Sequence, residues 1–230
     1  MTKRLKSRFA HFRELEPWQV ARPHFRFRNP VVEGMLELIT QAIYDYYEVA
    51  LATAVTAQRL FAIPIGGAYT PAGGAVFNKN RFHTNLEQAG MLSQPCKHLT
   101  RAVAVYFCGD ITPNDLNRFL HNTLLTFELT RKPYLEMQVG KLPGGGGGWG
   151  ISTQNNIGVL GNGSPDARNL YCFDEDKAVQ IEAGQNFDVI LDPLQVQGGA
   201  FVTDVAAAVP AGMGIRCHVY LEGDLARQVQ

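Results

Sequence analysis

Apolar and polar side chains alternate strictly over residues 215–221, near the carboxyl end of the chain. The apolar positions are Ile215, Cys217, Val219 and Leu221. A period of two places these four side chains on one face of a β-strand and leaves the other face polar. Strands with one buried and one polar face are typical of antiparallel sheets packed face to face. The segment therefore predicts an antiparallel β-sandwich.

Other segments have the same alternation or are short apolar runs bounded by turn residues. The further predicted strands are Arg59–Ile65, Arg101–Phe107, Leu125–Leu129, Tyr134–Val139, Val179–Ile181 and Phe187–Leu191. Residues 182–186 are turn formers, so the last two strands are expected to form a hairpin. Strands do not alternate with helices, which argues against a parallel sheet. With the closing strand, we expect about eight strands in a mainly β fold.

Helices are expected at a few places only. Apolar side chains recur four residues apart at Val31, Met35, Ile39, Ile43 and Tyr47, which favours a helix over residues 31–44 that braces the body. The end of this helix is left open, because Tyr44–Leu60 is rich in residues that favour strands. Two short helices are predicted, one over Leu86–Leu92 and one opening at Thr112, with Pro113 in its first turn.

The charge of the chain is balanced in total but divided along its length. The 230 residues carry 21 Lys+Arg and 21 Asp+Glu. Residues 1–30 hold eight bases and two acids, a charge of +6, so residues 31–230 hold 13 bases and 19 acids, a charge of −6. The eight bases are Lys3, Arg4, Lys6, Arg8, Arg13, Arg22, Arg26 and Arg28. The chain is thus divided into a basic arm, residues 1–30, and an acidic body, residues 31–230.

The basic arm alternates bases with aromatic residues, most clearly over His24–Arg28. Such a segment cannot bury a core, but its bases can neutralise phosphates while its rings stack on nucleobases. We therefore predict that the eight bases bind nucleic acid, without reading its sequence, or another anionic partner. Three alternatives stay open: an arm that binds a neighbouring subunit, a solvated tail, and an organelle-targeting peptide.

No catalytic residue, metal ligand or cofactor site is predicted. The run Gly144–Gly148 is followed by Trp149 rather than by the Gly-Lys-Ser of a phosphate loop, so we interpret it as a surface loop that orders at a subunit contact. The histidines lack the spacing of metal ligands; His83 and Glu87 are four residues apart, and Cys217 and His218 should face opposite sides of one strand. The four cysteines lie far apart and are expected to be reduced thiols.

The chain consists of a basic arm, a brace, and a β-rich body that has Gly/Pro-rich loops and ends almost at its last strand. This layout resembles that of viral coat proteins of the jelly-roll type. The best local matches are Val179–Leu191 and Ile215–Leu221. The resemblance implies a single jelly roll over residues 31–230, a homo-oligomeric shell, and an arm that faces packaged nucleic acid or neighbouring subunits. It also implies a place in the virion, such as that of a bacteriophage, after folding in the host cytoplasm, and no small-molecule substrate.

Only 18% of the residues are charged, which suits a subunit that buries much of its surface against copies of itself. Tyr44, Tyr46, Tyr47 and Trp149 are candidate aromatic residues for such contacts or for the core. Three other interpretations are kept: a virion spike or lectin-like β-sandwich binding module, a cupin-like enzyme on the same scaffold, and a body of two small jelly rolls.

Overall fold

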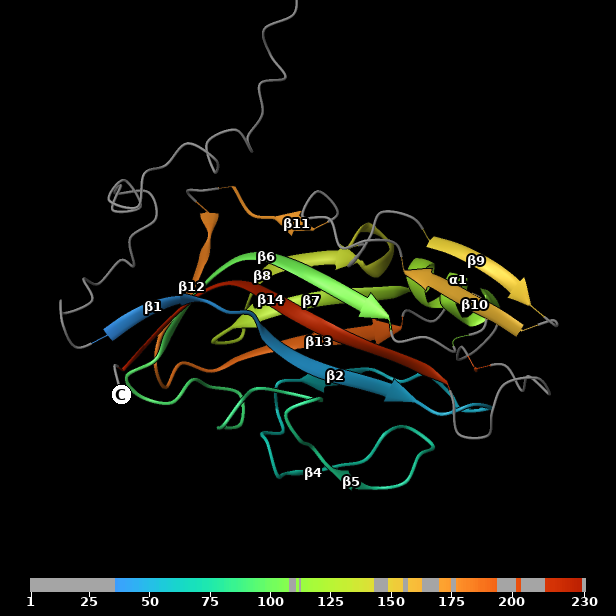
Figure 1. Cartoon of the computed structure of the whole chain (residues 1–230), viewed down its shortest axis with the longest axis horizontal. Helices are drawn as coiled ribbons and strands as arrows, with labels where there is room; N and C mark the ends of the chain where they lie inside the picture. The colour runs from blue at the N-terminus through green and yellow to red at the C-terminus, as the bar shows by residue number, and fades with distance from the viewer. Residues whose placement is uncertain are drawn as a thin grey trace, which may run out of the picture.

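The computed structural model describes residues 36–107, 111, 113–142, 149–154, 157–162, 170–174, 177–193, 202–203 and 214–228. In this part of the chain the protein is mainly β, with antiparallel sheets and one α-helix, α1 (Pro113–Asn122) (Figure 1). None of the described helices is long and apolar enough to cross a membrane.

The first sheet has six strands, built around the long closing strand. Its members are β1 (Leu36–Thr40), β2 (Ile43–Val49), β6 (Lys97–Phe107), β11 (Tyr171–Cys172), β12 (Val179–Ile181) and β14 (Ile215–Gln228). One edge of β14 pairs with β2 and then with β1, and its other edge pairs with β6. The far edge of β6 pairs with β12 and β11.

The second sheet has four strands in the order β3-β13-β7-β8. These are β3 (Gln58–Leu60), β13 (Phe187–Pro193), β7 (Thr123–Leu129) and β8 (Lys132–Gln138). Two small hairpins lie outside both sheets: β4 (Ala68–Tyr69) with β5 (Phe77–Asn78), and β9 (Trp149–Gln154) with β10 (Ile157–Asn162). A short 3-10 helix, η4 (Val139–Lys141), follows β8 and contacts α1.

The inward faces of the two sheets share one hydrophobic core, and Figure 1 shows β2, β14 and β6 lying across β7, β8 and β13. The closing strand alternates as predicted, because its four apolar side chains from Ile215 to Leu221 are fully buried. On the second sheet, Phe127 and Val189 are directly paired neighbours and both are fully buried. The core thus forms from the alternating apolar positions of both sheets.

Most predicted strands are confirmed, with small shifts at their ends. The segments Arg101–Phe107, Leu125–Leu129, Val179–Ile181 and Phe187–Leu191 lie in β6, β7, β12 and β13, and Tyr134–Val139 overlaps β8. The helix predicted to open near Thr112 is confirmed as α1, which begins at Pro113. Thr112 itself, the run Gly144–Gly148 and the basic arm lie outside the described residues.

The predicted brace helix over residues 31–44 is wrong where it can be compared. Residues 36–40 form β1, and β2 begins at Ile43. Ile39, Ile43 and Tyr47 share one face of extended chain, because a spacing of four is also a multiple of the two-residue period of a strand.

The helix predicted over Leu86–Leu92 is also wrong. The segment is a turn in which Gly90 has a φ of 65° and donates its N–H to the carbonyl oxygen of Phe61. A positive φ is incompatible with a right-handed helix. Leu86 and Leu92 instead anchor the turn in the core, where both are buried.

The hairpin predicted between Val179–Ile181 and Phe187–Leu191 is wrong as well. Strand β12 pairs with β6 in the first sheet, whereas β13 pairs with β3 and β7 in the second. Residues 182–186 therefore carry the chain from one sheet to the other. They are held by Gly184, which donates to the carbonyl oxygen of Leu92, and by Gln185, whose side chain accepts from the N–H of Glu182.

Candidate functional site

The bases predicted to bind nucleic acid lie outside the described residues. These are Lys3, Arg4, Lys6, Arg8, Arg13, Arg22, Arg26 and Arg28. The candidate sites formed by described residues therefore lie in the body. They are a buried ion pair, an aromatic cluster, a pocket and an acidic sheet face.

A buried ion pair attaches the long segment between β3 and β6 to β2. The Nζ of Lys79 lies 2.5 Å from Oδ1 of Asp45, and the two side chains are 2% and 0% exposed. The second carboxylate oxygen of Asp45 accepts the backbone N–H of Phe61. Burial raises the pKa of Asp45, against the opposing effects of Lys79 and of the Phe61 N–H. Because the pair is enclosed, it positions this segment and does not meet a ligand.

The same ion pair explains why the strand predicted over Arg59–Ile65 ends early. Strand β3 stops at Leu60, and Phe61 takes a φ of 66° that turns its N–H toward Asp45. Asp45 points inward from a strand whose inward neighbours are apolar, and its carboxylate can be buried only with partners. An acidic residue at an inward position of an apolar strand was the sequence signal that could have revealed this pair.

Aromatic and histidine rings gather on the outward side of β2 and β14, and the segment between β3 and β6 covers them. We call this group the outer aromatic cluster: Tyr44, Tyr46, Tyr69, Phe77, Phe82, His83, His218 and Tyr220. The ring of Tyr46 lies 5.0 Å from that of His83 and 5.1 Å from that of His218. The Nε2 of His218 is 2.9 Å from the carbonyl oxygen of Phe82. Sequence reasoning did not predict this cluster.

Burial lowers the pKa of both His83 and His218, so the two rings are neutral near pH 7. A neutral His218 donates through Nε2 to the Phe82 carbonyl oxygen. The Phe82 side chain itself is 65% exposed and that of Val76 is 63% exposed. The cluster thus holds a segment that presents two apolar side chains to the surroundings, a property of contact surfaces.

The four aromatic residues singled out from the sequence have different environments. Tyr47 is fully buried in the core, and Tyr46 is buried within the outer aromatic cluster. Tyr44 is half-buried, and its hydroxyl donates to the carbonyl oxygen of Arg81. The side chain of Trp149 lies outside the described residues. Only Tyr44 therefore remains, among the described members, as a residue with surface available for a partner.

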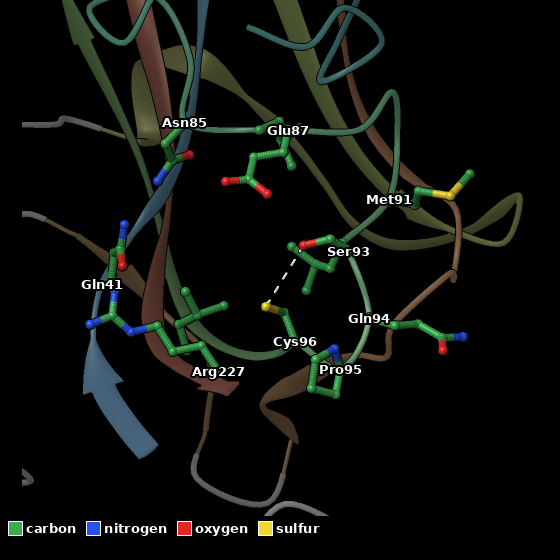
Figure 2. Close-up of a pocket in the computed structure, with 12 residues that line it drawn as sticks. Gln41, Asn85, Glu87, Met91, Ser93, Gln94, Pro95, Cys96 and Arg227 are labelled. Atoms are coloured by element: carbon green, nitrogen blue, oxygen red, sulfur yellow. Dashed lines mark hydrogen bonds between the residues drawn. The ribbon is translucent and has the colours of Figure 1, made fainter. Parts of the chain in front are cut away.

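A pocket of about 540 Å³ opens between the start of β2 and the turn before β6 (Figure 2). Its lining residues are Gln41, Asn85, Leu86, Glu87, Met91, Leu92, Ser93, Gln94, Pro95, Cys96, Leu225 and Arg227. Figure 2 shows the Glu87 carboxylate pointing into the space between Asn85 and Ser93. The Ser93 hydroxyl lies 3.8 Å from the Cys96 sulfur, and the lining includes no histidine to activate either nucleophile.

The metal candidates considered in the sequence are not brought together. His83 lies in a turn, and its Nδ1 accepts the N–H of Asn80. Cys217 faces the core while His218 faces outward, as predicted for neighbours on one strand. Among the described residues, no group of three or more His, Cys, Asp or Glu side chains could hold a metal ion. No disulfide joins the described cysteines Cys96, Cys172 and Cys217.

Neither a scan against protein-family models nor searches of curated proteins and of solved structures found a match to this chain.

Proposed function

We propose that the protein is a structural, self-assembling coat subunit of a virion, built on a single jelly roll and carrying a basic arm that faces packaged nucleic acid or neighbouring subunits. In this proposal the chain folds in the host cytoplasm and functions in the shell. The observation that carries the proposal is the way in which the strands pair.

The pairings are nested along the chain. If β1 with β2, and β11 with β12, each count as one interrupted strand, the two sheets contain eight strands, and the two small hairpins lie outside this count. In chain order the eight strands are β1/β2, β3, β6, β7, β8, β11/β12, β13 and β14. The first pairs with the eighth, the second with the seventh, the third with the sixth and the fourth with the fifth.

Such nesting supports a jelly roll, because it is the pattern of one long hairpin rolled into two sheets. The jelly roll is used by viral capsid proteins, lectins and cupins. The count of eight also favours a single jelly roll over two small ones. Among the three uses, the coat assignment rests on the division of charge between the arm and the body.

A basic arm of charge +6 joined to a body of charge −6 suits a shell protein. The arm would release counterions from packaged nucleic acid, whereas the acidic body would be repelled by the same polymer. Exposed apolar side chains on the body, such as Phe82 and Val76, suit contacts between copies.

Electron microscopy and light scattering of the purified full-length chain test the proposal. We expect closed particles, and a protein that stays monomeric at high concentration and over a range of salt would refute the coat function. A discrete trimer without particles would favour the spike or lectin-like module instead.

A second experiment addresses the arm. Deleting residues 1–28 should abolish salt-sensitive binding to nucleic acid while the far-UV circular dichroism of the body stays unchanged. If all eight bases neutralise phosphates, the logarithm of affinity should fall with the logarithm of salt at a slope of about −7. Equal binding by the full chain and the deletion variant would contradict the assignment of the arm.

A further inference from the structure

The outward face of the second sheet carries acidic side chains in adjacent rows. Cross-strand register places Arg59, Ile190, Thr126 and Glu136 in one row. Asp188 and Glu128 lie directly opposite each other in the next outward row, and Asp192 and Leu124 in the row on the other side. We call this surface the acidic face.

The acidic face is only partly neutralised by bases of the described chain. Arg59 pairs with Asp188 at 2.6 Å, and Lys132 lies at the hairpin end of the face with its Nζ 5.5 Å from the centre of the Tyr134 ring. Within the described residues, Glu128, Glu136 and Asp192 form no ion pair. Like charges directly opposite each other across a strand pair are destabilising, so this arrangement favours a cationic partner.

Apolar surface lies among the acids. Tyr134 is 45% exposed, and Leu124 and Ile190 are half-buried on the same face. A fitting partner therefore brings several positive charges together with aromatic or aliphatic groups. Nucleic acid does not fit, because its phosphates would be repelled by the four carboxylates.

The chain itself contains a segment with this chemistry. Residues 1–30 carry eight bases interleaved with aromatic side chains, as in His24–Arg28. We propose that the acidic face binds the basic arm of a second copy of the chain. Arginine side chains would pair with Glu128, Glu136 and Asp192, while the rings of the arm would cover Tyr134 and its apolar neighbours.

The arm of a second copy is a better occupant than the arm of the same copy. The arm leads into β1, which pairs with β14 in the first sheet, whereas the acidic face is on the side of the second sheet that points away from the first. An arm from the same copy would have to pass around the body. In an assembled shell, a neighbouring copy supplies its arm at high effective concentration; the inference rests on the proposed function in this respect.

Zero-length carbodiimide cross-linking tests the proposal directly, since it joins amines to carboxylates that are in contact. The full chain is prepared with natural nitrogen and with nitrogen-15, and the two are mixed in equal amounts before assembly. We expect cross-linked peptides that join Lys3 or Lys6 to Glu128, Glu136 or Asp192. Mixed-isotope pairs should be as abundant as the two unmixed pairs together. Absence of these peptides, or only unmixed ones, would overturn the proposal.

Charge reversal provides the matched comparison. Glu128→Lys with Glu136→Lys should remove these cross-links and raise the concentration needed for assembly about tenfold. Glu87→Lys, at an exposed acid of the pocket outside the acidic face, should change neither. If the double reversal does not fold, Glu128→Gln with Glu136→Gln replaces it, with the same expected direction. An unchanged assembly concentration and unchanged cross-links would refute the acidic face as the docking surface.

The results separate this inference from the proposed function. Closed particles without arm-to-face cross-links would overturn the inference and leave the coat function standing. Mixed-isotope cross-links in a small oligomer that never forms particles would support the inference and refute the coat function.

Discussion

Acid should destabilise the body through His98, a fully buried histidine on β6. Its Nδ1 lies 3.0 Å from Oγ1 of Thr100, and its Nε2 lies 3.1 Å from the carbonyl oxygen of Gln41. Because a carbonyl oxygen can only accept, Nε2 carries the proton and Nδ1 accepts from the threonine hydroxyl. Both ring nitrogens of the neutral histidine are thereby satisfied, and a second proton would disturb the bond to Thr100.

The direction and size of the effect follow from the pKa. The pKa of His98 is lowered from 6.5 to about 4, chiefly by burial and in addition by the positive charge of Arg101. Below pH 6.5 the unfolded chain binds a proton at this position and the folded chain does not, so stability falls as the pH drops from about 6.5 toward about 4. The difference of roughly 2.5 between the two values corresponds to a loss of about 3 kcal/mol at most.

Urea unfolding at fixed protein concentration and at pH 7, 6, 5 and 4.5 measures this loss. The wild type is compared with His98→Gln, whose amide can replace both hydrogen bonds but does not titrate. His121→Gln, at an exposed histidine of α1, is the matched control. We expect the free energy of unfolding of His98→Gln to decline less with acid than that of the wild type and of His121→Gln. Parallel declines for all three proteins would refute the reasoning, since His83 and His218 contribute equally to each.

Three further outcomes are expected. Lys79→Met leaves the Asp45 carboxylate buried without its cation and should lower the free energy of unfolding in urea by about 3–5 kcal/mol. Adding Asp45→Asn should recover part of this loss. A loss of under about 1 kcal/mol for Lys79→Met would contradict a buried ion pair. Gly223→Ala places a Cβ 1.9 Å from a carbonyl oxygen of β6, where the register between β14 and β6 shifts, and should cost more than about 2 kcal/mol, visible as a lower melting temperature. His218→Ala removes the hydrogen bond to the Phe82 carbonyl and should accelerate amide hydrogen exchange over residues 77–84 alone, whereas uniform acceleration would indicate general destabilisation.

The strands were predictable where alternation is strict, because a two-residue period has one simple structural meaning. The brace helix failed because a spacing of four residues fits both a strand and a helix. Ile43 and Tyr47 accordingly lie on the inward face of β2 and not on a helix. The sheet to which a strand belongs was not predictable either, as β12 and β13 show.

The candidate sites were less predictable than the strands, because they depend on contacts between distant segments. The outer aromatic cluster joins Tyr46 of β2, His218 of β14 and Phe82, and residues 46 and 218 lie far apart in the sequence. The Asp45–Lys79 pair likewise requires the segment after β3 to fold back over β2. Composition and spacing do not predict such contacts between distant segments. An acidic residue at an inward position of a strand does indicate that a basic partner must lie beside it.

The net charge of the body can be counted from the sequence, but the positions of its acids on the surface require the structure. The sum of −6 for residues 31–230 follows from counting, but it does not say where the acids lie. On the second sheet, cross-strand register places Asp188 opposite Glu128 and brings Glu136 into an adjacent row. On the first sheet, three acids each have a basic partner: Glu37, Glu48 and Asp224. The strands of the first sheet carry five acids and four bases, whereas those of the second sheet carry four acids and two bases. An arm of opposite charge can bind there only if the copies meet with that face accessible, which is the geometry that the isotope-mixed cross-links report.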